Sequence, residues 1–362
     1  ITTGAGNTAL GYNAGDALID GNDNVAVGQT ALSADTSGSN SVAIGGAALQ
    51  KQNFTSATNV YNTAVGRSAG KEITTGIQNT LIGGLAGDAI TTGQANTALG
   101  YRSLSATTTA ASNTAIGVDS LGSNTTGTSN TAVGRDTLNQ QTGASYNTAV
   151  GHQALNYTTA SNNTAVGFQA GYSNTTGTQN VAMGAFALGA NTTASNNVAI
   201  GYQSSQNNTT GSDNISLGMR ALRLNTTGGS NIAVGHNALY SNTTAELSTA
   251  VGYQSLYANT TANAITAFGA YSLMTNTTGA ANVAVGYSAL ELNTTGASNT
   301  ALGYKALEAN TTANANTAVG KDAMLANTTG GTNVAMGSDA LTANTTGSSN
   351  TALGQASLEA NT

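Results

Sequence analysis

Residues 299–312 read NTALGYKALEANTT, and close variants of this stretch recur along almost the whole chain. Each copy carries a glycine preceded by a short apolar run, such as Gly303, and 21 of these anchor glycines occur among the 362 residues. They lie seventeen positions apart except for one step of twenty-one, Gly45–Gly66, and one of sixteen, Gly151–Gly167. A fixed period of this length is the signature of a solenoid. We therefore expect residues 1–362 to form a single repeat array rather than two globular domains.

The residues around each anchor glycine follow a strand-like pattern. Three residues before it every unit has Thr, Val or Ile, two before it 19 of 21 units have Ala, and one before it all 21 are apolar. This alternation and the β-branched residues indicate a short strand. The Leu four residues after the glycine, present in 15 units, indicates a second extended segment, and Asn-Thr-Thr-Gly provides a return turn. The pattern predicts an all-β parallel β-solenoid of about 21 coils.

The charged residues suggest which positions face inward. None of the 24 lies one or three residues before an anchor glycine or four residues after it, so we expect these three positions to face the interior. Seventeen lie one, two or five residues after the glycine and the others lie in the longer turn, and we expect all 24 at the surface. The Ala two residues before the glycine then points outward. Its small size in nearly every unit indicates close contact between subunits, with the smoothness of a sheet as the alternative reason.

The composition includes few residues that could catalyse a reaction or bind a metal ion. The absence of Cys excludes disulfides and cysteine-ligated metals, and only 7% of the residues are charged. The two histidines, His152 and His236, lie five coils apart, or roughly 24 Å at the spacing of adjacent strands, and cannot share a metal ion within one chain. We find neither a glycine-rich phosphate-binding loop nor a nucleophile motif. We expect no enzymatic activity, no cofactor and no metal site.

The charge and hydropathy of the chain also indicate whether it binds nucleic acids or membranes. A formal net charge of −6 without a basic patch speaks against nucleic acids and anionic membrane surfaces as partners. No stretch approaches the roughly 18 consecutive apolar residues of a membrane-spanning helix, so we expect no membrane insertion.

Aromatic residues gather in the column directly after the anchor glycine, which they share with Arg, Lys and His. Outward aromatic side chains stack on sugars or on receptor surfaces, so this column is the candidate binding surface. The equally weighted alternative is that these rings cover the turn or pack between subunits. The candidate residues are Tyr12, Tyr101, Phe168, Tyr202, Tyr253, Tyr287 and Tyr304.

Twelve Asn-Thr-Thr turns match the acceptor pattern for N-glycosylation. The turn itself favours Asn and Thr, and we prefer this explanation of the match to a column of glycans. The candidate acceptors include Asn124, Asn174, Asn259, Asn293 and Asn344.

Two segments carry a resemblance to known proteins. Ser41–Gly45, SVAIG, and Asn197–Gly201, NVAIG, resemble the head repeats of trimeric autotransporter adhesins of the YadA type. The longer consensus unit, NTAVGYQAL with NTTG, resembles repeat regions of phage tail fibre proteins that precede a self-cleaving intramolecular chaperone domain. The resemblance covers residues 7–361 and implies a left-handed parallel β-roll that trimerises around a shared axis. The repeat period of this chain is longer than that of the adhesin heads.

These observations predict a non-enzymatic fibre or adhesin shaft, as in a phage tail fibre segment that gives reach and attaches to a host surface. The alternative is a cell-surface trimeric adhesin or a self-assembling extracellular filament. Both imply an extracellular location on a virion or cell surface, self-association, and a cell-surface receptor or glycan as partner. Ile1–Gly4 and Asn361–Thr362 look like parts of units, so we expect either flanking protein or end-to-end stacking of copies.

Regular threonine rows also raise the alternative of an ice-binding solenoid. Some of these rows fall in the return turn, and the strand Thr alternates with Val from unit to unit. We interpret this alternation as a sign that the strand Thr side chains face the interior, where they could not contact ice. Ice binding is therefore the weakest of the three expectations.

Overall fold

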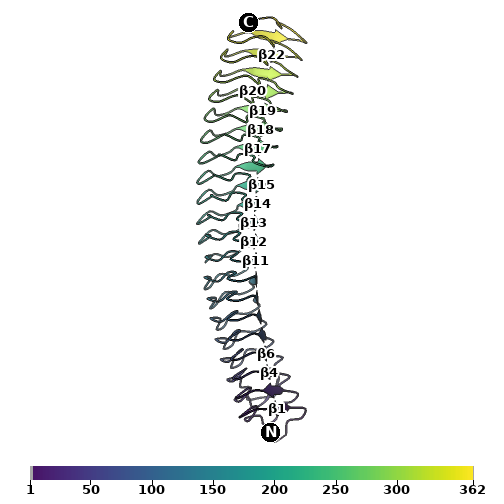
Figure 1. The fold of residues 1–362 in the computed structure, drawn as a ribbon, viewed down its shortest axis with the longest axis vertical. Coiled ribbons are helices and arrows are strands. Elements are labelled where there is room, and N and C mark those ends of the chain that lie inside the picture. The colour runs from purple at the N-terminus through teal and green to yellow at the C-terminus, as the bar shows by residue number, and fades with distance from the viewer. Residues whose placement is uncertain (1–2, 362) are drawn as a thin grey trace. The chain divides into compact units, whose positions relative to one another are not determined.

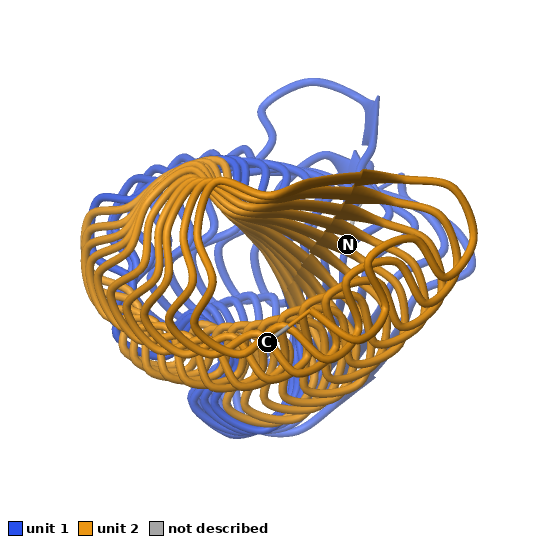
Figure 2. Cartoon of the chain, turned by 90° about the horizontal axis from the view of Figure 1, so that it is seen from above, with its two compact units in different colours: residues 1–179 blue, residues 180–362 orange. Residues whose placement is uncertain are grey.

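The structure is a computed structural model that describes residues 3–361. Those residues form short strands, turns and bends, without a helix. The chain divides into two compact units, residues 1–179 and 180–362, and each is a parallel β-solenoid with one coil per sequence repeat. Figure 1 follows the chain coil by coil, and Figure 2 colours the two units separately. Ile1, Thr2 and Thr362, which belong to the end segments interpreted above as parts of units, lie outside the described residues.

Each coil contributes one three-residue strand that ends directly before its anchor glycine, which confirms the predicted fold class. The strands of the first unit are β1 (Thr8–Leu10), β2 (Val25–Val27), β4 (Val42–Ile44), β6 (Thr63–Val65), β7 (Thr80–Ile82), β8 (Thr97–Leu99), β9 (Thr114–Ile116), β10 (Thr131–Val133), β11 (Thr148–Val150) and β12 (Thr164–Val166). Those of the second are β13 (Val181–Met183), β14 (Val198–Ile200), β15 (Ile215–Leu217), β16 (Ile232–Val234), β17 (Thr249–Val251), β18 (Thr266–Phe268), β19 (Val283–Val285), β20 (Thr300–Leu302), β21 (Thr317–Val319), β22 (Val334–Met336) and β23 (Thr351–Leu353). Two further strands, β3 (Gly38–Ser39) and β5 (Thr58–Asn59), pair with each other beside the long step Gly45–Gly66.

Within each unit, neighbouring strands pair in parallel and without offset. Ala132 of β10 pairs with Ala149 of β11, for example. Backbone bonds between coils continue through the turns, where the N–H of Leu307 donates to the carbonyl of Ala323 at 3.0 Å. The sequence period therefore places each residue over its counterpart in the preceding coil, at the strand spacing of about 4.8 Å.

The segment around the Ala-Leu pair is not the second extended segment that the sequence predicts. Lys305 and Leu307, two and four residues after Gly303, both have φ near 54°, in the left-handed region. Such angles cost about 1–3 kcal/mol at residues other than glycine. Here they turn the N–H of Lys305 toward the carbonyl of Tyr287, at 2.9 Å, so bonds between coils offset the strain. The coil consequently has one strand and a tight turn in place of two strands.

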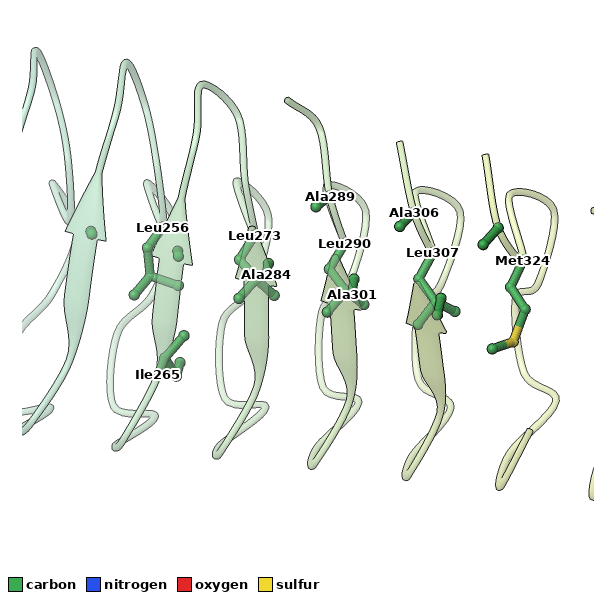
Figure 3. Packing of buried hydrophobic residues seen from close by; sticks show 14 of the residues in the cluster. Leu256, Ile265, Leu273, Ala284, Ala289, Leu290, Ala301, Ala306, Leu307 and Met324 are labelled. Atoms are coloured by element: carbon green, nitrogen blue, oxygen red, sulfur yellow. The ribbon is translucent and has the colours of Figure 1, made fainter. Parts of the chain in front are cut away.

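The predicted orientation of the strand residues was wrong. The central Ala is fully buried, as at Ala132, whereas its neighbours Thr131 and Val133 remain partly exposed. The Leu four residues after the glycine is buried as expected. Figure 3 shows Ala284 and Ala301 beside the row of Leu side chains, and both alanines belong to the same buried cluster as those leucines. The Ala column is therefore core, and the proposed role of this column in subunit contact does not hold.

Coils that depart from the consensus compensate within the same space. Gly70 and Gly87 replace the buried Leu, and a Cβ at either glycine would lie within 3.0 Å of side-chain atoms. Besides one atom of Leu49, those atoms belong to Leu81, which replaces the central Ala, and to Ile73 and Ile90, which replace an Asn of the return turn. Larger residues at neighbouring positions thus fill the space that the missing Leu side chains leave.

Two buried columns of asparagine run through most of the coils. Asn316, before the strand, donates its backbone N–H to Oδ1 of Asn299 at 2.9 Å and its Nδ2 to the carbonyl of Gly330 at 2.9 Å. Asn310, in the return turn, donates Nδ2 to Oδ1 of Asn293 at 2.8 Å. These side chains satisfy each other from coil to coil, because a buried amide without partners is costly.

Candidate functional site

The residues three and one before each anchor glycine form an outward surface that we call the strand face. No charged residue occupies either position in any of the 21 coils. Thirteen of its side chains are exposed large hydrophobics: Leu10, Ile44, Ile82, Leu99, Met183, Ile200, Ile215, Ile232, Phe268, Val283, Leu302, Met336 and Leu353. Exposed apolar patches of more than about 300–600 Å² mark interaction sites on soluble proteins. The strand face is therefore the first candidate surface.

The strand face changes in character along the chain. Strands β6 to β12 of the first unit all begin with Thr, and none of these seven hydroxyls donates to a protein acceptor within residues 3–361. Strands β13 to β16 of the second unit begin instead with Val or Ile, which makes both outward positions aliphatic in four successive coils. The threonines of the return turn behave differently, since Thr311 donates Oγ1 to the carbonyl of Thr328 at 3.2 Å.

The residues one, two and five after each anchor glycine form a second surface, the turn face. All seven predicted aromatic residues point outward on it, with exposed fractions between 42% for Phe168 and 72% for Tyr12. This placement agrees with the sequence interpretation, while binding through these rings stays a prediction.

Some of these aromatic residues are brought together, in an arrangement that the sequence alone does not reveal. In the second unit a ladder of rings runs through His236, Tyr253, Tyr271, Tyr287 and Tyr304, with centroids 5.4–5.7 Å apart. Tyr271 belongs to this ladder although it lies two residues after its glycine rather than one, so a search of a single column misses it.

A second, shorter stack lies five residues after the glycine. Tyr240 and Tyr257 pack with ring centroids 5.1 Å apart and planes only 10° from parallel. The sequence could have identified this pair, because the two tyrosines occupy the same position in consecutive repeats.

The candidate glycan acceptors do not lie at the surface. All five side chains are at most 1% exposed. Asn124 donates Nδ2 to the carbonyl of Gly127 at 3.0 Å, and Asn293 donates Nδ2 to Gly296 at 2.9 Å. A glycan on such a nitrogen would break the buried asparagine column, so the folded coil contradicts these sites. The Asn-Thr-Thr match reflects the needs of the turn.

Most cationic side chains among residues 3–361, on the turn face and next to it, pair with carboxylates. Lys51 contacts Glu72 at 2.6 Å, and this hydrogen bond lowers the pKa of Glu72. Lys305 pairs with Glu308 at 3.0 Å, and the hydrogen bond to Glu308 raises the pKa of Lys305. Lys321 pairs with Asp322 in the same way. These exposed pairs contribute little to stability.

One charge is not at the surface, contrary to expectation. Asp35 is fully buried at the position where most coils carry the return-turn Asn. Its Oδ2 accepts from Nε2 of Gln52 at 2.6 Å, and its Oδ1 accepts from the N–H groups of Gly38 and Phe54 at 3.0 Å. The carboxylate thus anchors the insertion of the long step Gly45–Gly66, which leaves it no free oxygen for catalysis.

The histidines lie apart, in different units. His152 packs on Phe168 at 5.5 Å and His236 on Tyr253 at 5.4 Å. Within residues 3–361 we find no group of three or more His, Cys, Asp or Glu side chains arranged for a metal ion. The described part of the chain also holds no helix that is long and apolar enough to cross a membrane.

Comparison with known proteins gives no family assignment. No protein-family model matches the sequence, and no curated protein matches it significantly. The candidate surfaces therefore rest on the geometry of the chain alone.

Proposed function

We propose that this chain is a non-enzymatic structural protein, a segment of an extracellular trimeric fibre of the phage tail fibre type. Its role is to hold an attachment surface away from the particle that carries it and to contact a host or cell surface. The strand faces of three copies turn toward a common axis, and the turn faces point outward.

The observation that carries this proposal is the division of charge between the two surfaces. The strand face is uncharged in every coil and exposes large hydrophobic side chains, whereas the turn face holds most of the charges. A second copy presents the same repeat, so it can match the strand face coil for coil, as symmetric self-association requires. We propose three chains per assembly because Ser41–Gly45 and Asn197–Gly201 resemble the repeats of trimeric adhesins.

The mass of the protein in solution tests this proposal. Sedimentation equilibrium of the full chain should give three times the chain mass of 35.5 kDa. Met336→Lys places a charge on the strand face and should reduce the trimer fraction. Ser338→Lys, on the turn face of the same coil, is the control, because Lys321 beside Asp322 shows that a lysine fits there. A wild-type mass of 35.5 kDa would overturn the trimer.

Electron microscopy of the same sample separates the fibre segment from its alternative. Discrete particles of one length support a fibre segment. Filaments of indefinite length support end-to-end assembly into an extracellular filament and contradict the discrete trimer.

A second candidate function, ice binding, is favoured by the outward threonines. The sequence interpretation assigned the strand Thr to the interior, and the structure places Thr63, Thr80 and Thr97 outward, at half-buried positions. Unpartnered hydroxyls at a regular spacing of about 4.8 Å can order water. Measurable thermal hysteresis that Thr131→Lys abolishes would support this function, and its absence would exclude it.

A further inference from the structure

Three of the nine cationic side chains lack a carboxylate partner within residues 3–361, and two of these, Arg220 and Arg223, share one coil of the second unit. Arg67, in the first unit, is the third. The turn face between residues 180 and 290 carries no Asp or Glu, so these two guanidinium groups form its only charged cluster. The other six cations of the described chain, Arg67 apart, each have a carboxylate within 4 Å.

Neutral side chains hold both guanidinium groups in place. The Nε of Arg220 donates to Oε1 of Gln203 at 3.1 Å, and the Nε of Arg223 donates to Oε1 of Gln206 at 3.2 Å. A guanidinium offers five N–H donors, so most of those on both residues remain available. The groups are thus oriented without being neutralised, which suits the bidentate recognition of a carboxylate.

The aromatic ladders begin in the coil that follows the arginines. Nη1 of Arg223 donates to the hydroxyl of Tyr240 at 2.7 Å, and its guanidinium lies 5.8 Å from the centre of that ring. Tyr240 stacks on Tyr257, while His236 in the same coil begins the longer ladder. Because coils repeat at about 4.8 Å, the cations and the rings form one strip along the turn face.

We propose that this strip binds an acidic polysaccharide whose carboxylate groups are separated by neutral sugars. A carboxylate occupies the donors of Arg220 and Arg223, and the neighbouring sugars lie along the tyrosines. The proposal rests on the attachment role proposed above and names the chemistry of the ligand.

The ring geometry favours a saccharide over a single-stranded nucleic acid. Nucleic-acid bases need free ring faces for stacking. Here Tyr240 and Tyr257 stack on each other, as do Tyr287 and Tyr304 with planes 12° apart, so each of these rings has one face covered by its neighbour. Phenol hydroxyls form hydrogen bonds with sugar hydroxyls. A nucleic acid carries one phosphate on every nucleotide, and its binding relies on many cations. A site with only two cations is better suited to a polysaccharide whose carboxylates are widely spaced.

Binding measurements on the full-length chain test the proposal, with hyaluronan and heparosan as acidic probes whose carboxylates alternate with neutral sugars, dextran as the neutral probe and single-stranded DNA as the competing class. We expect both acidic probes to bind more tightly than dextran and DNA. The double variant Arg220→Gln/Arg223→Gln should weaken this binding about tenfold or more, since charge-assisted hydrogen bonds are lost. Tyr257→Ser should weaken it without changing the salt dependence.

Two control variants decide whether the site or the net charge is responsible. Lys321→Gln removes one paired cation and Arg67→Gln removes one unpaired cation outside the strip, and both should bind as the wild type does. No binding of either acidic probe, equal loss in the controls, or tighter binding of DNA would overturn the proposal. Sedimentation of each variant reports assembly separately, so a trimer that binds no polysaccharide refutes this site and leaves the fibre proposal standing.

Discussion

The alanine two residues before each anchor glycine sets the width of the coil. It lies against the buried Leu of the turn, and 19 of the 21 coils keep it. Where Leu81 replaces it, Gly70 and Gly87 provide the space. Size at this position therefore matters more than hydrophobicity, since a packed interior tolerates neither extra nor missing methylene groups.

Enlarging this alanine tests the orientation. Ala132→Leu should lower the free energy of unfolding by about 1–3 kcal/mol because the larger side chain overpacks the coil. Val133→Leu, one residue later on the strand face, should change it little. Thermal melts followed by circular dichroism measure both variants. A harmless Ala132→Leu together with a destabilising Val133→Leu would reverse the assignment.

Adjacent asparagines allow a matched test of the buried column. Nδ2 of Asn208 donates to Oδ1 of Asn191 at 3.2 Å, and its Oδ1 accepts from Asn225 at 2.8 Å, whereas the neighbouring Asn207 is exposed. Asn208→Ala should cost about 1–3 kcal/mol in the free energy of unfolding, because it leaves buried amides unsatisfied. Asn207→Ala should cost little, and equal effects in urea unfolding would contradict a structural role for the column.

Asp88 predicts a stability change that depends on pH. Burial raises the pKa of Asp88 above its ordinary value of 3.8, and its Oδ1 is buried without a hydrogen-bond partner among the described residues. The ionised carboxylate therefore destabilises the fold at neutral pH. Asp88→Asn should raise Tm at pH 7, and the gain should vanish below about pH 3, where Asp88 is protonated in both states. A gain that is the same at both pH values would refute this explanation.

At the scale of the element, one coil is a three-residue strand followed by turns that contain left-handed residues. The spacing of glycines predicted the strand, its parallel register and the return turn. The left-handed angles at residues such as Leu307 could not be predicted, because only bonds to adjacent coils make them favourable. The inward Ala was missed for a related reason: hydrophobicity alone does not reveal how narrow the coil is.

The anchor glycines leave no space for a side chain between adjacent coils. Gly303 has φ 143°, and a Cβ there would meet the carbonyl oxygen of Gly320 in the next coil. Gly303→Ala should therefore destabilise the chain by more than about 1 kcal/mol. Gly46→Ala is the control, since no atom lies within 4 Å of its Cβ position. Equal melting temperatures for the two variants would show that the coils are not packed so closely.

At the scale of the whole molecule, repetition separates the surfaces. Because every coil directs the same positions to the same side, a preference for uncharged residues at two positions becomes an uncharged face on each unit. The seven predicted aromatic positions were found from the sequence, but their grouping was not. The ladder of the second unit includes Tyr271, and Arg220 and Arg223 become notable only once the ion pairs of the other cations are known.

The most direct test of the fibre proposal asks which surface lies between copies, and the chain, which has no Cys, is well suited to it. Met336→Cys puts a single thiol on the strand face, and Ser338→Cys puts one on the turn face of the same coil. Disulfides need Cα atoms about 4.4–6.8 Å apart, so only thiols that meet at an interface are oxidised efficiently. We expect cross-linked pairs of chains on a denaturing gel for Met336→Cys and single chains for Ser338→Cys. Cross-links at Ser338→Cys with none at Met336→Cys would contradict it.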